Sequence, residues 1–331
     1  MCVDRIVCVA GLCAISHMHE SLMVLQATVP VYLMVLLGLL LRRFRVLRPG
    51  MDKGLMAVAV HVFFPCLILD KMLAAEVLRN PMVFLSSAGM GFLFILAGAA
   101  LSYFFAPLIG LRLGGGRRTF AVAGGLQNYG YIAIPLVAYL YPDNDDVMAV
   151  LFTHNLGVEL AMWTVLLMLI SGQINPSWRV FMKGPIIAVV LGLLLMETGT
   201  DNYVPDFMGK FFAALGVCAV PLSLLLVGVA LHDLIGKMKF DWKIGTGALL
   251  VRLALIPALI LACAKCLPLG IELKQVLVVQ AAMPAAMFPI IMARHYGGRA
   301  DVAATVVLAT TLVSLLTMPL VIAFGKFWLG V

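Results

Sequence analysis

The sequence contains few charged residues. Only 12% of its 331 residues are Asp, Glu, Lys or Arg, whereas 63% are hydrophobic. Because soluble domains carry about 25% charged residues, this composition excludes an ordinary soluble protein and predicts an all-α polytopic membrane protein. The net charge of +7 comes from basic residues scattered through short loops, without a basic patch interleaved with aromatic residues. We therefore expect the lipid bilayer, and no nucleic acid, as a partner.

The sequence also lacks the residue patterns of a disulfide framework, a metal site or an enzyme. Its seven cysteines are an odd number, and most lie in apolar stretches where cysteine packs as a small hydrophobic residue. Cys263 and Cys266 form a single C-x-x-C without a second pair or a nearby histidine, so we expect no metal and no cofactor. No nucleophile or pair of acids lies at one membrane depth. A membrane-embedded enzyme is therefore the less favoured alternative.

Apolar runs long enough to cross a membrane, about 20 residues each, recur along the chain. We expect ten transmembrane helices, at residues 22–41, 54–73, 82–108, 119–141, 147–170, 185–198, 207–231, 246–267, 274–293 and 302–325. Residues 1–21 form an N-terminal tail whose apolar part is too short to span. A weak signal peptide, or a start at Met18 or Met23, is an alternative interpretation of this tail.

Loop charges predict how these helices are oriented. The loops after the odd-numbered spans carry Arg42, Arg43, Arg45, Arg48, Lys53, Arg112, Arg117, Arg118, Arg179, Lys183, Lys237, Lys239, Lys243, Arg294 and Arg299. The opposite side has fewer basic residues and collects acids such as Asp145 and Asp201. By the positive-inside rule the basic loops are cytoplasmic. We therefore expect a multi-pass protein of the inner (plasma) membrane with both termini outside.

The sequence contains signs of an internal repeat. Three pairs recur at an offset of about 155 residues: Pro65 with Pro221, Pro135 with Pro289 to within two residues, and Asp146 with Asp301. We interpret residues 22–170 and 171–331 as two five-helix halves. Because five is odd, the second half enters the membrane from the opposite side, which gives the inverted repeat typical of secondary transporters.

Two spans contain residues that interrupt a helix. The ninth contains QAAMPAAMFPI at residues 280–290, and the fourth contains GGLQNYGYIAIP at residues 124–135. Proline removes a backbone donor, and irregular backbone in a bilayer needs burial in protein or a cavity. We therefore predict that the fourth and ninth helices break and cross, and that their half-helix N-termini bind an anion. The candidate substrate-binding residues are Gln127, Asn128, Gly130, Pro135, Gln280, Met283, Pro284 and Pro289.

A second set of polar residues lies within other predicted spans. Glu159 is an acid at hydrocarbon depth, which makes it a functional candidate. Asn155 lies one turn before it on the same face, beside His154. Arg252 should lie at comparable depth, so Glu159 and Arg252 form either a structural ion pair or a coupling or gating site. His61 is either a proton-transfer group or a hydrogen-bonded packing residue.

The stretches LQNYGYIAIPL and QAAMPAAMFPIIMARHYGG resemble the two crossover segments of the auxin efflux carrier family, whose bacterial members include malate and malonate permeases. The resemblance covers nearly all of residues 22–331. It implies a scaffold from helices 1, 2, 6 and 7, a transport domain from helices 3–5 and 8–10, and elevator-like alternating access. Asn128 occupies the family's substrate-contacting asparagine position. Gln127 stands where plant members have proline, and the long central loop of the plant carriers is absent.

These features predict a secondary carrier of small organic anions such as malate or malonate. Export is favoured because an inside-negative potential pushes anions outward. A cation-coupled symporter of the related bile-acid type is an alternative. The sequence leaves open the substrate, the coupling ion and whether the protein forms a homodimer.

Overall fold

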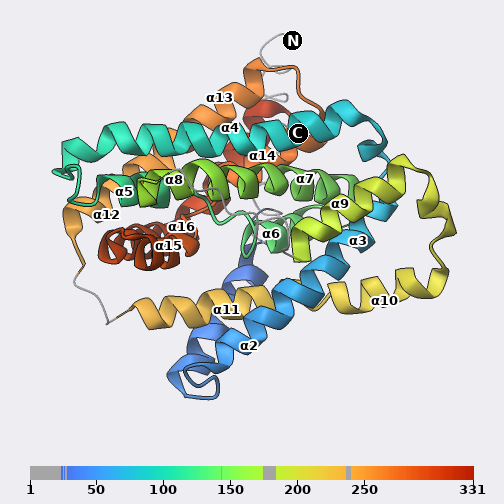
Figure 1. The fold of residues 1–331 in the computed structure, drawn as a ribbon, viewed down its shortest axis with the longest axis horizontal. Coiled ribbons are helices and arrows are strands. Elements are labelled where there is room, and N and C mark those ends of the chain that lie inside the picture. The colour runs from blue at the N-terminus through green and yellow to red at the C-terminus, as the bar shows by residue number, and fades with distance from the viewer. Residues whose placement is uncertain (1–23, 25, 27, 143, 174–183, 236–239) are drawn as a thin grey trace, which may run out of the picture.

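The structure, a computed structural model, describes residues 24, 26, 28–142, 144–173, 184–235 and 240–331. The predicted N-terminal tail at residues 1–21 lies outside this part of the chain, as do Arg179, Lys183, Lys237 and Lys239. The described residues form helices and short connections, with one isolated β-bridge and no strand (Figure 1). The all-α prediction is therefore confirmed for this part of the chain.

The described helices include six segments that are long and apolar enough to cross a membrane. These segments are Met51–Ala74, Pro81–Ile109, Asp145–Ser171, Asp206–Leu234, Trp242–Cys266 and Ala300–Leu329. They coincide with six of the predicted spans, which identifies the chain as a polytopic membrane protein. A shorter apolar helix, α9 (Gly184–Glu197), lies at the predicted sixth span, and residues 28–43 are helical at the first.

Several of the long segments are composed of successive helices. The labels in Figure 1 correspond to α2 (Met51–Val58), α3 (Phe64–Ala74), α4 (Pro81–Phe105), α5 (Arg117–Gly125), α6 (Ala133–Leu140), α7 (Asp145–Ala161), α8 (Leu167–Ser171), α10 (Asp206–Gly216), α11 (Ala219–Leu234), α12 (Trp242–Leu250), α13 (Ile256–Cys266), α14 (Ile271–Ala282), α15 (Phe288–Tyr296) and α16 (Ala300–Leu329). In the view of Figure 1, α2, α3, α10 and α11 lie together below α4, α5, α7 and α8.

Two of the long segments widen into a π-helical turn just before a proline. The turn Ala59–Phe63 precedes Pro65, and the turn Val251–Leu255 precedes Pro257. Proline lacks an N–H group and clashes with the carbonyl four residues earlier, and a wider turn accommodates both effects. The local sequence thus accounts for the irregular turn that contains Arg252.

The predicted interruptions of the fourth and ninth spans are present. The chain leaves the helical conformation between α5 and α6 and again between α14 and α15. Met283 is extended, with φ −71° and ψ 138°, as expected for the residue before Pro284. The second proline of the stretch, Pro289, was also expected to interrupt a helix, but it does not. It lies in the first turn of α15, where a missing N–H costs no helical hydrogen bond, and Pro135 lies similarly in α6.

Glycines allow α4 to approach α7 and α5 closely. A Cβ atom on Gly91 of α4 would lie 2.0 Å from the carbonyl oxygen of His154, and one on Gly157 would lie 1.8 Å from that of Ala88. A Cβ atom on Gly125, where α5 ends, would lie 2.5 Å from a backbone nitrogen of α4. Small residues permit such backbone contact between membrane helices. α4 therefore fixes both α7 and the start of the first interruption.

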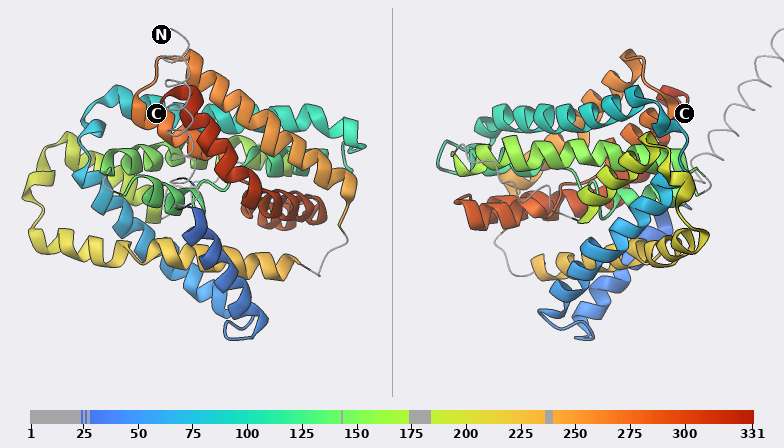
Figure 2. Two further views of the ribbon diagram at one scale, coloured as in Figure 1. Left: turned by 180° about the vertical axis from the view of Figure 1, so that it is seen from behind. Right: turned by 45° about the vertical axis from the view of Figure 1, so that its right-hand side comes forward.

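The second interruption is enclosed by helices from the C-terminal part of the chain. α16 packs against α12, α13 and α14, and α14 also contacts α7 and α6 (Figure 2). The non-helical residues that follow α14 are thereby held against those that follow α5.

Candidate functional site: the crossing of two interrupted helices

The two interruptions pair with each other through their backbones. The amide of Asn128 donates to the carbonyl oxygen of Pro284 at 2.8 Å, and the amide of Ala286 donates to the carbonyl oxygen of Leu126 at 2.9 Å. Gln127 and Ala285 lie opposite each other in an antiparallel bridge. Each segment thus satisfies backbone groups that the other leaves without helical partners, as irregular backbone at membrane depth requires.

Asn155 of α7 connects both interrupted segments. Its Nδ2 donates to the carbonyl oxygen of Tyr129 at 3.0 Å, and its Oδ1 accepts from Nε2 of Gln280 at 3.0 Å. His154 Nδ1 lies 3.4 Å from the same Oδ1, which is a weaker contact. The structure therefore brings Asn155 and Gln280 to the crossing together with Asn128.

The side chains of Asn128 and Gln127 present unused hydrogen-bond donors. Oδ1 of Asn128 accepts from the amide of Tyr131 at 3.1 Å, while no described residue accepts from its Nδ2. Nε2 of Gln127 is buried, and no described residue accepts from it either. A Cβ atom on Gly130, two residues after Asn128, would meet nothing within 4 Å, so there is open space at Gly130. Buried amides without acceptors are suited to a ligand that accepts hydrogen bonds.

Arg252 caps the end of α14 and does not pair with Glu159. It is fully buried, and its Nε and Nη2 donate to the carbonyl oxygens of Met283 at 2.9 Å and Gln280 at 3.3 Å. Its Nη1 has no hydrogen-bond acceptor among the described residues, and no described carboxylate forms an ion pair with it. The predicted pair is therefore wrong. The interruption exposes carbonyls at the end of α14, and a guanidinium can bond two of them at once.

Glu159 instead connects α7 to the residue after Asn128. Its Oε1 accepts from the hydroxyl of Tyr129 at 2.5 Å, and its Oε2 accepts from Nε1 of Trp163 at 2.8 Å. The Trp163 ring also contacts the ring of Phe288 at the start of α15, with centroids 5.2 Å apart. The acid thus has two donors in the same region as the crossing.

Sequence reasoning missed three residues of this region. Tyr129 and Trp163 bind Glu159, and the hydroxyl of Thr310 in α16 accepts from the amide of Ala285 at 3.2 Å. The spacing of Trp163, four residues after Glu159, was a usable signal because such side chains share a helix face. Nothing in the sequence around Thr310 distinguishes it from other hydroxyls that bond their own helix.

His61 is not brought to the crossing by any described contact. Its Nδ1 lies 2.9 Å from the carbonyl oxygen of Ala57, one turn earlier on its own helix. The side chain is exposed, so this contact with its own helix does not make His61 a buried packing residue. Within the described residues, no group of three or more His, Cys, Asp or Glu side chains is placed to hold a metal ion.

These features define a multi-pass membrane protein with a buried polar site where two interrupted helices cross. Residues 23–177 and 173–322 match the family described as membrane transport protein, and the chain belongs to that family. The resemblance to the auxin efflux carriers is confirmed by this match.

Two archaeal relatives are also named as transporters. An uncharacterized transporter of Methanocaldococcus jannaschii is 30% identical over 138 residues, which cover 41% of this chain and 44% of that protein. An uncharacterized transporter of Methanothermobacter thermautotrophicus is 24% identical over 302 residues, which cover 89% of this chain and 96% of that protein. The names of both relatives give transport as the function and give no substrate.

Proposed function

We propose that this protein is a secondary carrier of small organic anions such as carboxylates, and that it binds them at the crossing. The observation that carries this proposal is the burial of Arg252 without a described carboxylate partner. A buried charge without a counter-charge is costly, and an anionic substrate would reduce that cost. A cationic substrate would add to it.

The hydrogen-bonding groups near Arg252 also favour an anion. Nδ2 of Asn128 and Nε2 of Gln127 are donors, and a carboxylate is an acceptor for both. The C-terminal end of α14 would repel an anion, but Arg252 donates to two of its carbonyl oxygens. The helices α6 and α15 begin just after the crossing, and their N-terminal ends attract negative charge.

The transport cycle that we propose is an elevator-like movement within a ten-helix inverted repeat. Its support is that the fourth and ninth spans are both interrupted and bond each other. In this proposal residues 22–170 and 171–331 are the two halves. Helices 1, 2, 6 and 7 form a scaffold, and the others carry the crossing across the membrane. Multi-pass insertion in the plasma membrane, with both termini outside and net export of substrate, belongs to the same proposal.

A cation-coupled symporter is the second candidate, and Glu159 is the observation that favours it. Its carboxylate lies beside the crossing, hydrogen-bonded to the neighbour of Asn128. A proton or cation held there would be close to the substrate. In this candidate, transport responds to an imposed gradient of that ion, whereas a uniporter of anions responds to voltage alone.

Transport by purified protein in sealed liposomes tests these proposals. We expect labelled malate or malonate to accumulate chemically unchanged, and faster when the lumen is positive. Empty liposomes and the Asn128→Ala protein are the controls. A set of mono- and dicarboxylates that is not transported at all would overturn the proposed function. A sodium requirement would support the symporter, and a chemically altered solute would support the enzyme.

A further inference from the structure

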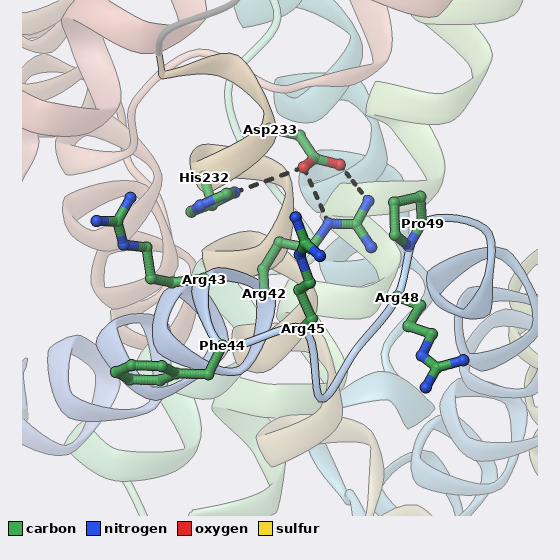
Figure 3. A pocket seen from close by; sticks show the side chains of 8 residues that line it. All are labelled: Arg42, Arg43, Phe44, Arg45, Arg48, Pro49, His232 and Asp233. Carbon is green, nitrogen blue, oxygen red and sulfur yellow. Dashed lines mark hydrogen bonds and ion pairs between the residues drawn. The ribbon is translucent and has the colours of Figure 1, made fainter.

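A hollow of about 820 Å³ lies at the end of the helix formed by residues 28–43 (Figure 3). Its walls come from residues 42–49 and from the end of α11, and none of the residues at the crossing lines it. Four arginines surround it: Arg42, Arg43, Arg45 and Arg48. The acidic residue of its lining is Asp233.

Arg42 is a structural part of this hollow. Its Nε donates to Oδ1 of Asp233 at 2.9 Å, and a second bond joins its Nη2 to the same carboxylate (Figure 3). Its Nη1 contacts Asp52 at 3.4 Å and the carbonyl oxygen of Leu47 at 3.2 Å. Arg42 thus fixes the loop to α11, and two carboxylates offset its charge.

The other three arginines are exposed, and their side chains have no hydrogen-bond acceptor among the described residues. Together they give the hollow an excess of positive charge that the protein itself does not neutralise. Arg45 has φ 61°. Among the described residues it is the only residue other than glycine with a positive φ. Glycine is the usual residue in this conformation after a helix end. An arginine at this position therefore adopts a less favourable backbone conformation.

Exposed apolar side chains alternate with these arginines. Phe44 is 73% exposed and Val46 is 62% exposed. Basic and aromatic side chains together are typical of the boundary between lipid tails and headgroups. The alternation indicates a ligand that has both a negative headgroup and an apolar part.

We propose that this hollow binds the phosphate headgroup of an anionic phospholipid. In Figure 3 the side chains of Arg43 and Arg48 point to opposite sides of Arg45, so Arg45 contacts the phosphate and the other two attract it by their charge. Phe44 packs against the start of the acyl chains. Guanidinium groups suit this role because they bond phosphate oxygens in pairs. The site is separate from the crossing, so it does not depend on the proposed transport function.

Native mass spectrometry of the full chain in detergent tests this assignment. The probes are phosphatidylglycerol and, as the neutral control, phosphatidylcholine with the same acyl chains. We expect the protein to retain phosphatidylglycerol in preference. The triple variant R43Q/R45Q/R48Q should weaken this binding by up to about 100-fold, because each basic residue near an anionic lipid strengthens binding about fivefold.

A matched variant controls for the loss of charge alone. R112Q/R118Q/R294Q removes the same number of exposed arginines from other parts of the surface, and it should bind phosphatidylglycerol like the parent. Arg45→Gly covers the case in which the triple variant fails to fold. Glycine suits the positive φ, so this variant should melt like the parent yet bind the lipid about fivefold more weakly.

Two results would overturn the assignment. One is phosphatidylglycerol binding that is unchanged in both R43Q/R45Q/R48Q and Arg45→Gly, or that falls equally in the control variant. The other is inorganic phosphate that binds the lipid-free parent and displaces phosphatidylglycerol at millimolar concentration, which would make the hollow a site for a free anion.

Discussion

Nε of Arg252 donates a hydrogen bond to the carbonyl oxygen of Met283 at 2.9 Å, so a residue of one membrane segment closes the end of the interrupted helix in the next. Met283 is extended because Pro284 follows it, and this conformation ends α14 and leaves carbonyl oxygens unpaired. A charge is therefore held at the crossing by backbone acceptors and not by an acid.

The structure predicts that Arg252 and Glu159 act independently. Arg252→Gln should lower stability by about 1–3 kcal/mol, because the loss of two bonds from a charged donor outweighs the gain from removing a buried charge. Glu159→Gln should cost about 1–3 kcal/mol, because one of two donors loses a charged acceptor. With no ion pair between them, the double variant should lose roughly the sum. Thermal unfolding of the four proteins checks this, and recovery of stability in the double variant would restore the ion-pair interpretation.

Substitutions of Asn128 should distinguish its role in the local turn from its role in substrate binding. Asn128→Asp keeps an oxygen that can accept from the amide of Tyr131, but it replaces the Nδ2 donor with negative charge. We expect this protein to fold like the parent and to bind a carboxylate about 10- to 100-fold more weakly, the value of a hydrogen bond to a charged group. Binding measured by thermal shift, alongside Asn128→Ala, tests the prediction. Parent-like affinity in both variants would remove Asn128 from the site.

The two prolines of the ninth span should differ in effect. Pro284→Ala relieves the restriction on Met283 and allows α14 to extend, which would withdraw the carbonyl that accepts from Asn128. Pro289→Ala changes a first-turn position, where either residue fits, so its stability should change by less than about 1 kcal/mol. We expect substrate affinity to fall in the first variant and to stay close to the parent in the second. Equal losses in both variants would contradict this reading of the interruption.

Substitution of Glu159 tests whether transport is coupled to a proton. We expect Glu159→Gln in liposomes to retain transport driven by voltage, and we expect the parent to show no response to a pH gradient at fixed voltage. Trp163→Phe is the companion variant, since it removes one donor to the carboxylate and keeps the acid. A parent that responds to the pH gradient, with Glu159→Gln insensitive and Trp163→Phe still responsive, would assign proton coupling to this acid.

The close contact between α4 and α7 offers a test with an internal control. Gly157→Ala would place a Cβ atom 1.8 Å from the carbonyl oxygen of Ala88, so the two helices must separate. Overpacking of this kind typically costs about 1–3 kcal/mol, or more where backbone must move. In Gly89→Ala on α4 the added Cβ atom would have no atom within 4 Å, so this variant should be as stable as the parent or slightly more stable. Similar melting temperatures for both variants would show that the contact is looser than described.

The sequence by itself determined the class of the protein and the end of the interrupted helix α14, although not the effect of Pro289. A composition with 63% hydrophobic and 12% charged residues is typical of a protein embedded in a lipid bilayer. In a bilayer, backbone groups must form their hydrogen bonds within the protein. Helical hydrogen bonds join residues four apart, so glycine and proline act within one turn and their effects can be read locally. The end of α14 before Pro284 was therefore predictable, as were the six long apolar segments.

Only the tertiary structure decided which side chains meet. Arg252 and Glu159 were expected at similar depth, but depth does not specify the direction in which each side chain points or what competes for it. The guanidinium binds carbonyl oxygens that exist only because α14 is interrupted, and the carboxylate binds Tyr129 and Trp163. Partners of buried polar groups depend on the packing of segments far apart in the chain, because each group takes the nearest donor or acceptor that the folded protein leaves unpaired.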